Sequence, residues 1–224
     1  MLIILPVLLG IALALVRGGS LRNLAMLRFR GVGAIMASFL IQLVTYVPPM
    51  RDTALVRQHG EAIYIGVLAL MLLGVARNWR LGLSARLIFL GLTINTVVVV
   101  ANGGHMPVNA AALRAAEGPA VVRVIAAHQK YPSRMLADRS SVLLPFSDIL
   151  PISLPVGFGF VGSLGDLFIA FGGATLAYSA ARRPGRGDAD TSEPGIRGVR
   201  GSLSGRGDQP AAASLGAPGT AEVA

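Results

Sequence analysis

The chain has 224 residues, of which 53% are hydrophobic and 14% charged, whereas soluble domains carry about 25% charged residues. This composition argues against a soluble helical protein and favours one that lies in a membrane. The formal net charge is +9, but the cations flank apolar stretches and do not alternate with aromatic residues, so no nucleic-acid partner is expected. There is no cysteine, which excludes disulfides and thiolate metal ligands.

Five apolar stretches predict transmembrane helices, because lipid offers no water to unsatisfied backbone amides. They cover residues 1–16, 31–47, 62–76, 81–101 and 161–181. A hydrocarbon core of about 30 Å needs about 20 helical residues, so several stretches are near the lower limit and the third is the shortest. We predict an all-α, multi-pass bundle of about five spans that forms a transmembrane domain over residues 1–181.

The first stretch has a second interpretation as a secretory signal peptide, because the tripeptide at residues 12–14, Ala-Leu-Ala, resembles a cleavage site. However, no lysine or arginine precedes the apolar run, and Arg17 follows it closely. This order of charges favours a retained span.

The distribution of cations predicts the orientation. Thirteen of the 20 lysines and arginines lie on one side of the alternation, in the gaps after the first and third stretches, at Arg86 near the start of the fourth stretch, or in the C-terminal tail. The cations nearest the spans form three groups, at residues 17–30, 77–86 and 182–186. By the positive-inside rule, the N-terminus faces outward and the C-terminus faces the cytoplasm.

Polar side chains within the spans are expected to find partners on neighbouring helices, and they are Gln42, Thr45, Thr93, Asn95 and Thr96. No charged residue lies in the middle of a span, which argues against a proton relay through the membrane.

The loop at residues 102–160 is the longest segment between spans and is predicted to lie outside. It opens with Asn-Gly-Gly-His-Met-Pro at 102–107, where the glycines and the proline predict a sharp exit from the membrane. Runs at 109–116 and 119–130 predict surface helices separated by Gly118. Prolines and glycines over 142–160 exclude a continuous helix and favour an interfacial or re-entrant hairpin.

Four residues of this outer region are ligand-binding candidates: Asn102, His105, Asp148 and Asp166. Asp148 lies among prolines and apolar residues, so we expect its pKa to be raised, although an Asx turn would also explain it. The sequence Ser-Leu-Gly-Asp at 163–166 predicts a capping box for the last helix, which gives Asp166 a structural role.

No metal site and no cofactor are predicted. All three histidines, His59, His105 and His128, fall on the predicted outer side, but their spacing matches no known ligand pattern. No phosphate-binding loop, nucleophile elbow or dinucleotide-binding glycine pattern occurs, so no catalytic residues are predicted. Residues 182–224 are rich in Gly, Ser, Ala, Pro and Arg without apolar periodicity, which predicts a disordered cytoplasmic tail.

The chain resembles a family of small bacterial multi-pass membrane proteins of uncharacterised function. The resemblance depends on the five-helix layout, on the Asn-Gly-Gly-His-Met-Pro motif after the fourth helix and on Ser-Leu-Gly-Asp before the fifth. It covers residues 1–183 and implies a location in the bacterial inner membrane, but it implies no reaction.

Two hypotheses follow. The first is a non-enzymatic membrane protein, either a subunit of a larger complex or a module that binds a small molecule or lipid. The alternative is a membrane enzyme or carrier with its site at the outer interface, between the fourth and fifth helices. The expected partners are the lipid bilayer and other membrane proteins.

Overall fold

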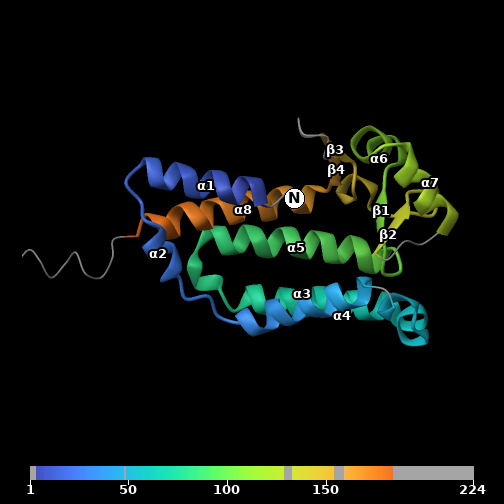
Figure 1. Cartoon of the computed structure of the whole chain (residues 1–224), viewed down its shortest axis with the longest axis horizontal. Coiled ribbons are helices and arrows are strands. Elements are labelled where there is room, and N and C mark those ends of the chain that lie inside the picture. Colours follow the sequence, from blue (N-terminus) through green and yellow to red (C-terminus); the bar gives the residue numbers. More distant parts are fainter. Residues whose placement is uncertain (1–3, 48, 129–132, 154–158, 184–224) are drawn as a thin grey trace, which may run out of the picture. The chain divides into compact units, whose positions relative to one another are not determined.

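Long apolar helices run side by side in the computed structural model, which describes residues 4–47, 49–128, 133–153 and 159–183 (Figure 1). Their bounds are α1 (Ile4–Val16), α3 (Val32–Tyr46), α4 (Ala54–Ala76), α5 (Leu83–Ala101) and α8 (Leu164–Ala181). α8 packs against both α1 and α5, and α4 packs against both α5 and α3. Most of the predicted disordered tail falls outside the described residues.

Three of these helices, α4, α5 and α8, are long and apolar enough to cross a membrane, with 23, 19 and 18 residues. α1 and α3 are apolar but shorter, with 13 and 15 residues. α4 extends beyond the third apolar stretch at residues 62–76, because it begins at Ala54, where the Thr53 side chain accepts a hydrogen bond from the Val56 amide. Hydropathy detects only the apolar part of a helix, whereas the first turns of α4 are polar.

The arginine-rich segments meet at one end of the helices. There, the amide of Ser20, which precedes α2 (Leu21–Ala25), donates to the carbonyl of Ala181, with an N···O distance of 2.8 Å. Asn78, just before η2 (Trp79–Leu81), accepts from the Arg30 amide and donates to the Arg30 carbonyl, at 2.7 and 2.6 Å. These bonds bring residues 17–30, 77–86 and 182–183 together, as their alternation along the chain predicts.

The opposite end is built from short elements. They are η1 (Met50–Asp52), β1 (Met106–Val108), α6 (Ala110–Glu117), α7 (Pro119–His128), β2 (Arg134–Leu136), η3 (Leu144–Phe146), β3 (Leu150–Ser153) and β4 (Gly159–Gly162). The two helices predicted in the loop at residues 102–160 are confirmed as α6 and α7. Their apolar faces form a core with Val108 and Val161, in which Leu113 and Ile125 are buried.

The fold is mostly helical, as the sequence predicts, but the outer loop also contains four short strands that were not predicted. β1 and β2 pair in parallel, with Met106 opposite Arg134, and β3 and β4 form an antiparallel pair with Leu150 opposite Gly162. The prolines and glycines of this region prevent helix formation, and pairing between strands satisfies its backbone groups in another way. The predicted hairpin is therefore a β-hairpin.

The polar side chains within the helices bond differently from the prediction. The hydroxyls of Thr45, Thr93 and Thr96 donate to carbonyls three or four residues earlier in their own helices. A threonine hydroxyl can reach that carbonyl without a partner helix, so the expectation of bonds between helices is wrong for these three. Asn95 does bond across helices, from α5 to α8.

Candidate functional site

The turn after α5 is fixed by Asn102. Its side-chain Nδ2 donates to the carbonyls of Val98 and Val142, at 2.8 and 3.0 Å, and its Oδ1 accepts from the Val142 amide at 2.9 Å. Gly103 and Gly104 have φ angles of 65° and 91°, which residues other than glycine rarely adopt. Asn102 thus attaches the proline-rich segment to the end of α5, which is a positioning role.

His105 follows this turn and faces α4. It is 5% exposed, and its Nδ1 lies 3.9 Å from Oε1 of Glu61, whose side chain is half exposed. A Cβ atom at Gly104 would lie 2.7 Å from the Cβ of Glu61, so only glycine permits this close approach between the turn and α4.

His105 and Glu61 line a cavity of about 700 Å³. Its walls come from the end of α3, η1, the first half of α4, the turn at 104–105, Val124 of α7, and Ser133. Side chains of both charges line it, with Arg51 and Arg57 beside Asp52 and Glu61. A concave space of this size with a few convergent polar groups is typical of a small-molecule site.

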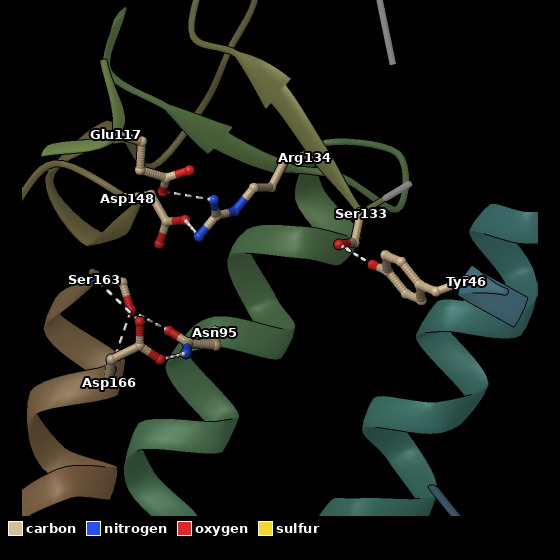
Figure 2. Close-up of polar contacts among 8 residues, drawn as sticks. All are labelled: Tyr46, Asn95, Glu117, Ser133, Arg134, Asp148, Ser163 and Asp166. Carbon is tan, nitrogen blue, oxygen red and sulfur yellow. Dashed lines mark hydrogen bonds and ion pairs between the residues drawn. The ribbon is translucent and has the colours of Figure 1, made fainter. Parts of the chain in front are cut away.

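Two tyrosines and a serine form one side of this cavity. Tyr46, at the end of α3, and Tyr64 of α4 both line it, and the hydroxyl of Tyr46 forms a hydrogen bond with the hydroxyl of Ser133 (Figure 2). The amide of Met106 donates to the carbonyl of Ser133 at 2.8 Å. Ser133 is therefore held from two sides, by α3 and by the residue that begins β1.

Asp148 is in a second, buried group of polar residues. It is 4% exposed, and its Oδ2 lies 3.5 Å from Nη2 of Arg134, while Nη1 of the same arginine lies 3.1 Å from Oε1 of Glu117 (Figure 2). The backbone of Asp148 bonds to Pro107 and Asn109 on either side of the end of β1. This fixes the position of its side chain.

Burial raises the pKa of Asp148 to about 7 because it disfavours the charged carboxylate. Arg134 opposes this shift, and the negative charges of Asp166 and Glu117 add to it. The expected raised pKa is confirmed. The Asx-turn interpretation is wrong, because among the described residues no backbone amide of that turn donates to this carboxylate, whose partner is Arg134.

Asp166 begins α8 in the predicted capping box, which is confirmed. Its amide donates to Oγ of Ser163 at 3.0 Å, and its Oδ2 accepts from the Ser163 amide at 3.1 Å. Asn95 joins this pair from α5, because its Nδ2 donates to Oδ1 of Asp166 and its Oδ1 accepts from Oγ of Ser163, both at 2.8 Å. Asp166 is thus held in place as a negatively charged cap.

The four candidate residues therefore lie in different places. His105 lines the cavity, Asn102 fixes the turn before it, and Asp148 and Asp166 lie near each other on the other side of Arg134 (Figure 2). The sequence analysis missed Arg134, Glu117, Tyr46 and Ser133. Each becomes part of a site only through contacts with distant segments, and no motif marks them. Within the described residues, no group of three or more metal-ligating side chains lies together.

The fold is a mostly helical bundle in which three helices can span a membrane, and short helices and strands cover one end. Residues 26–178 match the model of a family of unknown function, DUF5317, and the chain belongs to this family. The match includes α3, α4, α5, the short elements and most of α8. No curated protein and no solved structure matches the chain.

Proposed function

We propose that this protein is a multi-pass protein of the bacterial inner membrane, with five spans, the N-terminus outside and the C-terminus in the cytoplasm. The meeting of the arginine-rich segments at one end of the helices supports this orientation, because such segments are retained on the cytoplasmic side. α1 and α3 cross with the help of local thinning of the bilayer, at a cost that grows with the mismatch between the length of the helix and the thickness of the hydrocarbon core.

The function that the geometry supports best is non-enzymatic binding of a small polar molecule or a lipid head group at the outer end. The cavity of about 700 Å³ carries this proposal. Its arginines suit an anionic group, and Glu61 and the tyrosines suit a cationic one. His105 contacts the ligand, Asn102 positions the turn, and Asp148 and Asp166 support the neighbouring wall.

A subunit of a larger complex is the related form of this proposal. Large apolar side chains on α3, such as Met36, Phe39 and Leu43, are more than half exposed and suit either lipid or a neighbouring helix. An enzyme or carrier is the alternative, and the buried Asp148 with the partly buried Asp166 in the same region favours it. However, neither carboxylate is among the residues that line the cavity, so a substrate held there would not touch them.

The test is extraction of the full-length protein with its surrounding lipid into polymer-bounded discs, followed by mass spectrometry of everything that travels with it. We expect a specific lipid or metabolite that is lost in the R57A and E61Q variants. R139A is the matched control, because Arg139 is an exposed arginine outside the cavity.

Three results would count against ligand binding in the cavity. The first is the absence of any specific small molecule, and the second is a molecule that is retained in R57A and E61Q. The third is a stoichiometric protein partner without a small molecule, which would favour the complex subunit instead.

A further inference from the structure

At the covered end of the helices, one arginine pairs with two carboxylates, and a third carboxylate lies in the same region. Arg134 of β2 lies between Glu117 of α6 and Asp148, and Asp166 of α8 adds a third negative charge nearby (Figure 2). The charges of Asp148 and Asp166 also act on Tyr64 of α4. Asp148 is the buried member of this group, and a group with such an excess of negative charge is stabilised when one carboxylate binds a proton.

Asp148 is the carboxylate whose surroundings least favour a charge. Asp166 accepts hydrogen bonds from Asn95 and from the Ser163 amide, and it is only partly buried. Glu117 lies closer to Arg134 than Asp148 does, at 3.1 Å against 3.5 Å. Asp148 is also almost fully buried, and Arg134 is its charged partner among the described residues.

The backbone connects Asp148 to the cavity in two ways. The Asp148 amide donates to the carbonyl of Pro107 in β1, two residues after His105, which lines the cavity. Arg134 directly follows Ser133, which bonds to Tyr46 in the cavity wall. Ser133 has a φ of 69°, a left-handed conformation that a serine keeps only when its neighbours hold it there.

We propose that Asp148 is a proton-binding site and that its protonation is linked to the cavity through Arg134 and Ser133. The proton comes from water and forms an O–H bond on the carboxyl group, which becomes neutral. Arg134 then pairs with Glu117 alone, and the wall at Ser133 is held less tightly. Release of the proton restores the charge on Asp148 and draws Arg134 back. The link to a bound ligand rests on the proposed function, whereas the proton site does not.

The raised pKa of Asp148, about 7, places this step where it responds to the pH outside a bacterial cell. The mechanism needs no charged residue in the middle of a span, in agreement with the sequence, where none lies there. Asp148 follows η3 and lies among the short elements at the end of the helices.

The first measurement detects the proton directly. Infrared difference spectra of the full-length protein in lipid, between pH 6 and pH 8, should show a protonated carboxyl band at low pH that is missing in D148N and retained in D138N. Asp138 is the matched control, because hydrogen bonds from Ser140 lower its pKa and its carboxylate is exposed. In R134Q the protonated carboxyl band should disappear at a higher pH than in the unaltered protein, because Arg134 favours the ionised form of Asp148. That shift provides a second readout should D148N fail to fold.

The second measurement detects the link and needs no ligand. The chain has no cysteine, so Q58C places a single thiol at the exposed rim of the cavity. We expect its labelling rate to rise as the pH falls through 7, after correction for the thiolate fraction. If the pKa of Asp148 differs by one unit between the two conformations of the cavity wall, protonation changes the ratio of these conformations about tenfold. This factor sets the expected size of the change in labelling rate. D148N should remove the dependence.

Two further variants separate Asp148 from the titratable side chains of the cavity itself. The pH dependence of the labelling rate should persist in E61Q and in H105Q, each combined with Q58C. Its loss in either variant, with retention in D148N, would overturn the proposal. Absence of the Asp148 carboxyl band would overturn the proton site, and a band without pH-dependent labelling would overturn the link. None of these results depends on whether a ligand is found.

Discussion

Burial of Asp148 makes the stability of the folded protein depend on pH. Its pKa in the folded protein, about 7, is higher than the 3.8 of an unperturbed aspartate. Between these values the folded state binds more protons than the unfolded state, so the free energy of unfolding falls as the pH rises from about 4 to 7 and then levels off. D148N should remove this slope. Thermal unfolding in detergent at constant ionic strength checks it, and parallel curves for the two proteins would contradict it.

Asn78 is the most connected side chain at the arginine-rich end. It is 3% exposed, bonds to Arg30 through both its oxygen and its nitrogen, and also donates to the carbonyl of Gly74 at 2.8 Å. N78A removes the side-chain partner of the partly buried Arg30 amide and carbonyl and of the buried Gly74 carbonyl, so we expect a loss of about 1–3 kcal/mol in unfolding free energy.

Asn23 provides the control for this prediction. Its amide donates a single hydrogen bond, at 3.2 Å, to the carbonyl of Ala181 in a partly buried place. N23A should therefore cost less than N78A in the same unfolding assay. An equal loss of unfolding free energy in N78A and N23A would mean that the burial and additional hydrogen bonds of Asn78 do not contribute to stability.

At the scale of elements, the contact between α5 and α8 depends on two glycines. A Cβ at Gly165 would lie 2.1 Å from Oδ1 of Asn95, and one at Gly91 would lie 2.3 Å from the carbonyl oxygen of Gly165. G165A should therefore separate the helices, break the bonds between Asn95 and Asp166, and destabilise the protein by about 1–3 kcal/mol.

Gly66 of α4 is the matched control for G165A, because a Cβ there would meet nothing within 4 Å. G66A should be neutral or slightly stabilising, since alanine favours a helix over glycine by about 1 kcal/mol. Unfolding curves of the two variants provide the measurement. A similar loss in both would indicate an effect of helix propensity alone and not of close packing.

Local patterns predicted several elements because their causes are local. The capping box of Ser163 and Asp166, the break at Gly118 and the helices on either side of it all depend on residues within a few positions of one another. The parallel pairing of β1 with β2 could not be predicted, because it joins segments far apart in the chain with only three residues each. Arg134 was missed for the same reason.

At the scale of the whole molecule, the sequence predicted where the apolar helices lie but not how the end is covered. Hydropathy located five helices, and the polar start of α4 escaped it. Of the candidate site, His105 was predicted because it follows a distinctive turn. The cavity around it could not be predicted, because its wall combines residues of α3, α4, α7 and the segment before β2.

The proposed orientation predicts which end is accessible from outside. In the cysteine-free chain, a thiol introduced by S140C lies among the exposed residues of the covered end, and one introduced by R80C lies at the arginine-rich end. A membrane-impermeant thiol reagent should label S140C in intact spheroplasts and R80C only after permeabilisation. The opposite pattern would reverse the orientation, and labelling of both in intact spheroplasts would contradict a spanning fold.

The packing of α8 between α1 and α5 determines when the bundle can be completed. The ribosome makes α8 last among the long helices described above, so α1 can pack against α8 only after the other long helices have been made. Gly10 of α1 is shaped for that partner, because a Cβ there would lie 2.4 Å from the carbonyl oxygen of Ala174, and Ala14 is fully buried. A nascent chain that stops before α8 therefore leaves this face of α1 without its partner, and the bundle is completed only after α8 has been made.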